Sequence, residues 1–335
     1  MTQKNSIYFK DLANDWLLQK QISVKSSTYV KYRNILNKHI LPEFGDIQLK
    51  DLSNRKIMHF TNSKLNLANT KDDNALSQKT IKDILLVINN ILKYAKIYYP
   101  EEVSSIEITY PAIPKSEIRI LSLKEQRTLE EILYYEMDNV KLGILICLYT
   151  GLRLGEICGL RWEDISLYDG TISIRRTVQR LQTFSADGSP KTRLIVDAPK
   201  TISSVRKIPL PDFLLSIIKK RYPICPSCFL LTGKEDQCME PRTLENQFHS
   251  FIHLMEKLCK ADGEYDYQPG RLTFHSLRHT FATRCVESGF EIKCLSEILG
   301  HANVNITLNR YVHSSIQMKR ENMNKLSNTY QAIAL

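Results

Sequence analysis

With 335 residues, the chain is longer than one ordinary domain, so a small domain beside a larger one is expected. Its 46 Lys and Arg against 36 Asp and Glu give a net charge of +10, which favours a nucleic-acid partner. The longest apolar run, Leu142 to Tyr149, is far below the roughly 20 residues of a membrane span, and Met1 to Lys10 has no apolar signal core. With eight scattered cysteines, these features predict a reducing cytoplasm and no membrane partner.

Residues 1–104 are predicted to form a small helical domain. Between Phe9 and Tyr99 apolar residues recur at helical spacing, and about four helices fit. The expected boundaries are Ser27 or Thr28 as the cap of the second helix, Pro42 and Gly45 as its end, and Ser77 before the last helix.

Basic side chains on these helices are candidates for DNA contact. The set consists of Lys25, Lys31, Arg33, Lys79 and Lys82. For any one of them alone, a charged helix face in contact with solvent is the favoured explanation.

Residues 105–118 are predicted to be an interdomain linker, because the helical period disappears and Pro111 and Pro114 interrupt any helix there. The roughly 18 residues between Pro100 and Arg119, which lack a helical period, would span tens of ångströms when extended, enough for two domains to lie on opposite sides of a DNA duplex. The second domain is then expected over residues 119–335.

The second domain is predicted to be mostly helical with one small antiparallel sheet. Ser122 and Glu125 are spaced as a capping box, and an apolar helix around Leu142 to Leu148 should end at Gly151. The expected strands are Thr171 to Ile174, Leu194 to Val196 and Val205 to Leu210, with the loop Ser185 to Pro190 joining the first two as a hairpin, and helices returning from Pro211.

Three segments of this domain carry polar residues that a core does not need. Arg153 lies in Thr-Gly-Leu-Arg-Leu-Gly-Glu, where an ion pair with Glu156 is the simpler explanation. His275 and Arg278 share a helix face at i,i+3 behind Thr273, whose hydroxyl would cap that helix. Metal binding by His275 and His279 is disfavoured, since neither the intervening Glu nor a third ligand is evident.

The third segment contains His301, in Leu-Gly-His, and Tyr311 ten residues later. Together the three segments resemble the phage integrase, or tyrosine recombinase, family. Lys200, in Pro-Lys-Thr, looks like the lysine of that family's β-hairpin. The first domain resembles its helical, SAM-like core-binding domain through Ser27-Thr28-Tyr29 and His39 to Gly45, so the resemblance covers nearly the whole chain.

The resemblance implies a mixed α/β catalytic domain that cuts and rejoins DNA through a 3′-phosphotyrosine, without cofactor, metal or nucleotide. Tyr311 would be the nucleophile, and Arg153 and Arg278 would bind the scissile phosphate through their planar guanidinium groups. His275 would assist as base, Lys200 would protonate the departing 5′-oxygen, His301 would hydrogen-bond the phosphate, and Glu156 would orient the site.

The implied partners are double-stranded DNA with inverted core half-sites and three further copies of the chain. The tail from Ser314 to Leu335 would dock onto a neighbouring subunit of the tetramer, and an excisionase is a further candidate partner. The expected task is integration and excision of a mobile element by a nucleoid-associated bacterial or phage protein. A type IB topoisomerase and a catalytically silent DNA-binding regulator are the alternatives, and the arm-binding domain of larger integrases is not evident ahead of Phe9.

The Cys225-Pro-Ser-Cys228 motif allows a different function for one loop. With Cys238 and His249 it could form a zinc knuckle, but no second matched pair of cysteines is present. The following Phe229 to Thr232 looks like a strand edge, so packing is the favoured interpretation of the motif.

Overall fold

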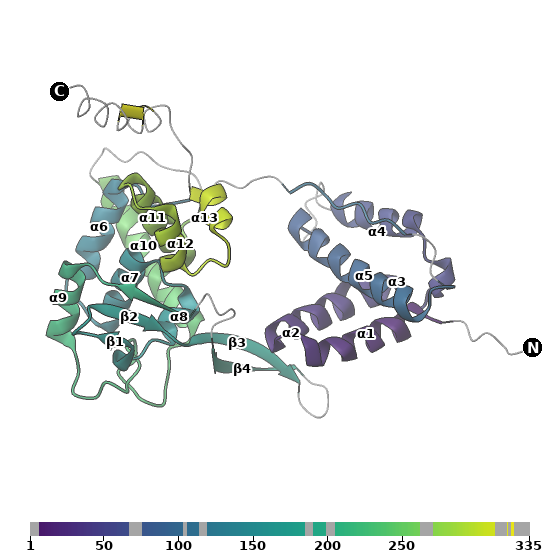
Figure 1. Ribbon diagram of the computed structural model, residues 1–335, viewed down its shortest axis with the longest axis horizontal. Helices are drawn as coiled ribbons and strands as arrows, with labels where there is room; N and C mark the ends of the chain where they lie inside the picture. Colours follow the sequence, from purple (N-terminus) through teal and green to yellow (C-terminus); the bar gives the residue numbers. More distant parts are fainter. Residues whose placement is uncertain are drawn as a thin grey trace, which may run out of the picture. The chain divides into compact units, whose positions relative to one another are not determined.

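The computed structural model of the chain describes residues 7–66, 76–102, 106–113, 119–184, 190–198, 205–261, 271–311, 320 and 323–324. These residues belong to two compact units (Figure 1). The helical unit comprises Met1–Ser116 with Leu181–Lys191, and the second unit comprises Glu117–Arg180 with Thr192–Leu335. None of the helices in the described ranges combines the length and apolarity that crossing a bilayer requires.

The helical unit is built around a long amphipathic helix. Its elements are α1 (Phe9–Ser23), α2 (Ser26–Ile35), a π turn (Leu36–Ile40), α3 (Leu41–Phe44), a 3₁₀ turn (Leu49–Asp51), α4 (Asn54–Asn66) and α5 (Gln78–Tyr98). Ser77 caps α5 by accepting a hydrogen bond from the Thr80 N–H at 3.1 Å, as expected. The buried face of α5 packs with Phe9, Leu12 and Trp16 of α1 in one apolar core.

The predicted start of the second helix was wrong, but the helical stretch that it opens ends at Gly45, as expected. It begins at Ser26, after Lys25, and neither Ser27 nor Thr28 is its cap. The chain also stays helical through Pro42, which lies in the first turn of α3. In the π turn directly before it, the Leu41 N–H bonds the Leu36 carbonyl five residues back. Proline is tolerated there because the first turn of a helix does not need its N–H.

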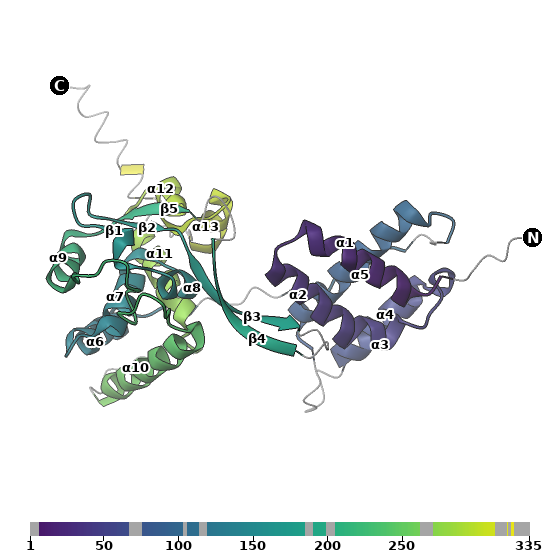
Figure 2. The ribbon, with the colours of Figure 1, turned by 90° about the horizontal axis from the view of Figure 1, so that it is seen from below.

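The second unit surrounds the apolar helix α7 (Asn139–Thr150) with further helices (Figure 2). These are α6 (Leu123–Tyr134), α8 (Leu154–Cys158), α9 (Asp212–Arg221), α10 (Pro241–Ala261), α11 (Phe274–Glu287), α12 (Ile292–Leu299) and α13 (Val304–Tyr311). The Ser122–Glu125 capping box of α6 is present, and α7 ends at Gly151 in the left-handed conformation, so both boundary predictions are confirmed. The fold class predicted from the sequence is therefore correct.

Two small sheets replace the one that was predicted. The first has the order β1 (Ile165–Ser166), β2 (Thr171–Ile174) and β5 (Arg206–Pro209), antiparallel throughout, with Ile172 opposite Ile208. The second pairs β3 (Thr177–Phe184) with β4 (Pro190–Asp197). The expected hairpin partner of β4 was thus wrong: it is β3, whose polar Gln179, Arg180 and Gln182 hid its strand character.

The segment between α9 and α10 is irregular, although the sequence predicted mainly helices from Pro211 onwards. Pro223, Pro226 and Gly233 interrupt it. The predicted strand at Phe229 to Thr232 is reduced to a single bridge between Phe229 and Arg161. A short 3₁₀ turn, Trp162–Asp164, lies beside it.

Candidate active site

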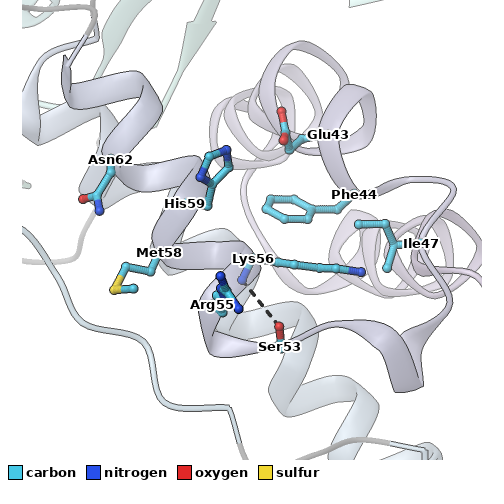
Figure 3. A pocket seen from close by; sticks show the side chains of 9 residues that line it. All are labelled: Glu43, Phe44, Ile47, Ser53, Arg55, Lys56, Met58, His59 and Asn62. Atoms are coloured by element: carbon cyan, nitrogen blue, oxygen red, sulfur yellow. Dashed lines mark hydrogen bonds between the residues drawn. The ribbon is translucent and has the colours of Figure 1, made fainter.

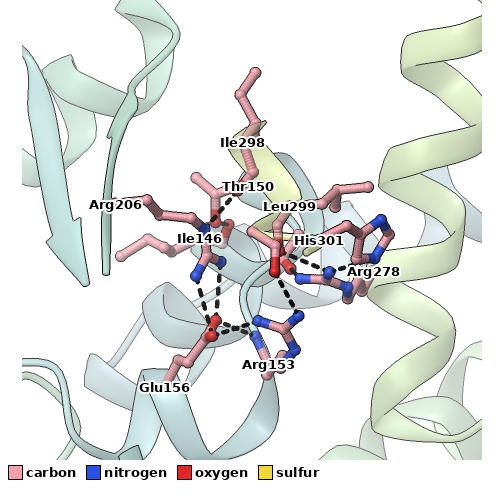
Figure 4. Close-up of polar contacts among 11 residues, drawn as sticks. Ile146, Thr150, Arg153, Glu156, Arg206, Arg278, Ile298, Leu299 and His301 are labelled. Atoms are coloured by element: carbon pink, nitrogen blue, oxygen red, sulfur yellow. Dashed lines mark hydrogen bonds and ion pairs between the residues drawn. The ribbon is translucent and has the colours of Figure 1, made fainter. Parts of the chain in front are cut away.

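Three arginines gather at the carboxyl end of α12 (Figure 4). Arg206 donates from Nε to the Ile298 carbonyl at 2.6 Å, Arg278 to the Leu299 carbonyl at 2.7 Å, and Arg153 to the Gly300 carbonyl at 3.2 Å. The last carbonyls of a helix have no partner within the helix and carry partial negative charge. The end of α12 therefore both attracts and orients the guanidinium groups.

Glu156 joins two of these arginines. Its carboxylate accepts from Arg153 at 2.7 Å and, in two parallel bonds, from Arg206 at 3.0 and 2.9 Å. Burial would raise the pKa of this carboxyl, but the hydrogen bonds and charge of Arg206, with the charge of Arg153, hold it below the usual value. Three guanidinium groups against one carboxylate leave an excess of positive charge, which suits an anionic ligand.

Arg278 is held from three directions. Besides Leu299, its guanidinium donates to the Gly151 carbonyl at 2.8 Å and contacts Nε2 of His301 at 2.8 Å. His301 is oriented in turn by the Thr307 hydroxyl, 2.8 Å from Nδ1. Burial, followed by the charge of Arg278, lowers the pKa of His301 to about 4, so the ring is neutral at pH 7.

Gly151 is needed where α7 meets this arginine. Its φ of +66° is strained for residues with a side chain, and a Cβ would lie 2.7 Å from the Phe281 ring and 2.8 Å from Leu299. The left-handed turn ends α7 and presents the Gly151 carbonyl to Arg278. The glycine is thus required both by the turn and by the close packing of α11 and α12 against it.

Tyr311, at the end of α13, is 7% exposed and its hydroxyl lies 2.7 Å from Nδ1 of His279. His279 immediately follows Arg278 on α11, so this hydrogen bond connects the tyrosine to the arginine cluster. The ring of His279 also packs edge-on against that of His275, with centroids 4.5 Å apart. Burial raises the pKa of Tyr311, although nearby Arg278 and Arg310 oppose the shift.

The two histidines of α11 are neutral at pH 7. Burial and the charge of neighbouring groups lower the pKa of His279 to about 3. For His275, which keeps more than a third of its surface exposed, partial desolvation and the charge of Arg278 lower the pKa to about 4. Both rings are therefore uncharged at pH 7, and each has one nitrogen that accepts a hydrogen bond.

The structure brings together five of the predicted site residues, Arg153, Glu156, His275, Arg278 and His301, near Tyr311 through the contacts above. Lys200 lies outside the described residues. The Arg153–Glu156 ion pair, offered as the simpler explanation, is present and belongs to the same cluster. The chemical roles assigned to these residues remain predictions.

Two residues of the site were missed. Arg206 lies two positions before the buried Ile208 on β5. Because side chains alternate between the two faces of a strand, both residues were expected on the same face. His279 was considered only as a metal ligand with His275, yet its i,i+4 position equally allowed contact with a common neighbour. The sequence spacing of Arg206 and His279 shows which face of the strand or helix each residue occupies. It does not identify the site until the elements that pack against those faces are known.

The basic residues predicted to bind DNA lie on α2 and α5 or next to them. Lys25, Lys31 and Lys79 are exposed, while Arg33 and Lys82 are partly buried. Lys31 pairs with Asp83 at 2.8 Å on the surface.

The helical unit also has a pocket of about 580 Å³, with Phe44, Ile47 and Met58 beside basic side chains (Figure 3). This pocket belongs to the helical unit, whereas the arginine cluster belongs to the second unit.

Comparison with protein families identifies the class to which this site belongs. The phage integrase family matches residues 120–318, and the N-terminal SAM-like domain of phage integrases matches residues 8–65. The chain therefore belongs to the phage integrase family, the tyrosine recombinases that break and rejoin DNA. The resemblance inferred from the sequence is confirmed.

Individual relatives agree with this assignment. A XerC-like tyrosine recombinase of Caldanaerobacter subterraneus is 27% identical over 96% of this chain and 83% of its own length. The ICEBs1 integrase of Bacillus subtilis is 23% identical, covering 97% of this chain and 84% of its own. The Tn1549 transposon integrase in complex with circular-intermediate DNA shares the fold, with a TM-score of 0.73 at 20% identity over 96% of this chain and 100% of that one.

Proposed function

We propose that this chain is a site-specific integrase whose Tyr311 attacks a DNA phosphate held by Arg153 and Arg278. The observation that carries the proposal is the hydrogen bond between the Tyr311 hydroxyl and His279, which is adjacent in sequence to Arg278, an arginine in contact with His301. Attack on a phosphodiester spreads negative charge over its non-bridging oxygens, and fixed guanidinium donors stabilise that charge in place. Arg153, which is partly exposed, has donors that remain available to such a ligand.

The proton of the tyrosine needs an acceptor. A phenol whose pKa is raised by burial is almost fully protonated at neutral pH. His279 is neutral and within hydrogen-bond distance, and His275 is neutral and more exposed. In our proposal His279 holds the resting tyrosine, and His275, as predicted from the sequence, assists when the phenolic oxygen meets the phosphate.

The remaining steps follow from the chemistry of the exchange. The bond from phosphorus to the tyrosine oxygen forms as the bond to the 5′-oxygen breaks, and Lys200 is proposed to protonate that leaving oxygen. The phosphotyrosyl ester is close in energy to the phosphodiester it replaces, so a 5′-hydroxyl of another strand reverses the step. Strand exchange then needs no nucleotide hydrolysis.

The substrate is proposed to be duplex DNA with inverted half-sites at the ends of a mobile element. Relatives include the ICEBs1 integrase and the transposases of Tn554 and Tn916, and a similar fold occurs in a lambda integrase tetramer bound to a Holliday junction (TM-score 0.62). We further propose that the chain forms a tetramer on DNA through its tail, Ser314 to Leu335, and that an excisionase is an accessory partner. The proposed domain boundaries are residues 1–104 for the core-binding domain, 105–118 for the linker and 119–335 for the catalytic domain. Truncation before Ser314 should then reduce cooperative binding to paired half-sites in gel-shift titrations.

A nicked suicide substrate carrying the chain's own recombination site tests the catalytic proposal. Wild-type protein should accumulate a covalent protein–DNA adduct that survives denaturing electrophoresis, and Tyr311→Phe should form none. Tyr168→Phe is the matched control, because Tyr168 is 99% exposed and should leave adduct formation unchanged. Absence of an adduct with wild-type protein that binds the site, or an adduct that persists in Tyr311→Phe, contradicts the proposal.

A further inference from the structure

Two cysteines and a glutamate meet in the irregular segment between α9 and α10. The Sγ atoms of Cys225 and Cys228 and a carboxylate oxygen of Glu235 all lie within 4.8 Å of one another. Across the described ranges, no other group of three or more His, Cys, Asp or Glu side chains has its ligand atoms this close. Cys238 and His249, the partners considered from sequence, are not part of it.

One arginine holds the two arms of this loop together. Arg161 donates to the Ser227 carbonyl at 2.7 Å on the cysteine arm and to the Glu235 carbonyl at 3.2 Å on the other. Its guanidinium also lies over the Phe229 ring, 4.4 Å from the centroid. The backbone that carries the three side chains is therefore positioned by contacts that do not involve the side chains themselves.

The loop is also fixed to the segment that follows α8. The Trp162 N–H donates to the Cys228 carbonyl at 3.1 Å, and the Glu163 N–H donates to the Pro226 carbonyl at 2.7 Å. The Leu230 N–H donates to the Leu160 carbonyl at 2.9 Å. This anchoring holds the Cys-x-x-Cys turn in place, so little chain entropy remains to be lost on binding a ligand.

The three ligand atoms suit a thiophilic divalent cation. Zinc binds thiolates at about 2.3 Å, which gives ligand-to-ligand edges of about 3.8 Å in a tetrahedron, so a contraction of about 1 Å or less completes the site. In the structure the Glu235 carboxylate accepts hydrogen bonds from Cys225 Sγ, at 3.1 Å, and from the Ser227 hydroxyl. A metal ion would replace the thiol proton in the first of these contacts. Because Glu235 is exposed, water is available as fourth ligand.

We propose that Cys225, Cys228 and Glu235 bind one Zn²⁺ ion, which braces this loop against the residues that follow α8. The ion would have a structural function, because the loop that it braces is hydrogen-bonded to Leu160, Trp162 and Glu163. Glu235, six residues beyond the bridge at Phe229, is the ligand that motif spacing did not suggest.

The test uses the full chain, purified, stripped with a chelator and kept reduced. Titration with Co²⁺ should give the near-ultraviolet thiolate-to-metal charge-transfer band, which should saturate at one equivalent. Added Zn²⁺ should displace the Co²⁺ and remove this band. Competition with a chromophoric chelator then gives the affinity for Zn²⁺. Cys225→Ser with Cys228→Ser should abolish the band. Glu235→Gln, which should leave folding intact because the side chain is exposed, should weaken Zn²⁺ binding at least about tenfold, the lower range for loss of a supporting metal contact.

Controls separate this site from general thiol binding. Cys294→Ser, which removes an exposed cysteine elsewhere, and Cys238→Ser should each leave affinity and stoichiometry unchanged. Absence of the band in reduced wild-type protein, or its persistence without Cys225 and Cys228, overturns the proposal. Unaltered affinity in Glu235→Gln, or loss of binding in Cys238→Ser, overturns the ligand set.

Discussion

The basic residues of the two units are arranged in different ways. In the second unit, Arg153, Arg206 and Arg278 are held by helix-end carbonyls and by Glu156. In the helical unit, the candidate DNA-contacting side chains lie on helix surfaces, as the exposed Lys31–Asp83 pair illustrates. The first arrangement is preorganised for one ligand geometry, whereas surface lysines contribute charge with little orientation. Substitutions should therefore have large, specific effects in one unit and small, additive ones in the other.

The largest effect is expected for Glu156→Ala. This change leaves the buried Arg206 and the half-buried Arg153 without their carboxylate, and breaking a buried ion pair costs about 3–5 kcal/mol. Urea unfolding should show a correspondingly lower midpoint. Glu163→Ala is the control: Glu163 is 44% exposed in its pair with Arg176, and its loss should cost below about 1 kcal/mol. Equal effects of the two substitutions would show that the buried carboxylate of Glu156 contributes no more to stability than an exposed carboxylate of the same unit.

The second-largest effect is expected for Arg278→Lys, on the rate of DNA cleavage. An ammonium group cannot make the contacts to Gly151, Leu299 and His301 and also bind a phosphate edge, so cleavage should slow about 100-fold or more, near 3 kcal/mol. Single-turnover adduct formation on the suicide substrate gives the rate. Arg242→Lys, at an exposed position on α10, should retain the wild-type rate. A loss below tenfold for Arg278→Lys would show that the guanidinium geometry is not required.

An intermediate effect is expected from pH. The folded pKa of the buried His279 is lowered from 6.5 to about 3, so its contribution to stability is complete above pH 6.5 and is lost as pH falls toward about 3. Between pH 7 and 5 this one group should remove up to about 2 kcal/mol. Thermal unfolding at the two pH values should show a smaller decrease in His279→Gln than in wild type. An identical decrease in both proteins would mean that His279 does not titrate in this way.

The smallest effects are expected for Lys31→Ala and Lys79→Ala in the helical unit. Each should change the free energy of unfolding by below about 0.5 kcal/mol, because both side chains are exposed. If each lysine contacts one phosphate, the slope of the logarithm of the DNA-binding constant against the logarithm of the salt concentration should become shallower by about 0.9 per substituted residue. Lys96→Ala, an exposed lysine of α5 outside the predicted set, is the control. Equal slopes for all three variants would remove these lysines from the DNA interface.

Much of the fold followed from local signals. The Ser77 cap, the Ser122–Glu125 box and the end of α7 at Gly151 were readable because each depends on neighbours within four residues. Strand pairing was not readable in the same way. β2 pairs with β5, more than thirty residues away, and the polar strand β3 has no alternation strong enough to identify it. Pro42 misled for a related reason, since a π turn before it keeps the chain helical.

The sequence by itself determined the family, the helical character of both units and the identity of the reactive residue types, because these depend on composition, period and motif order. Only the tertiary structure decided that the end of α12 orients three arginines, that Tyr311 rests on His279, and that Glu235 joins Cys225 and Cys228. Each of these contacts joins segments that are distant in sequence or separated by irregular chain. Its geometry is set by packing of whole elements, and no local spacing encodes that packing.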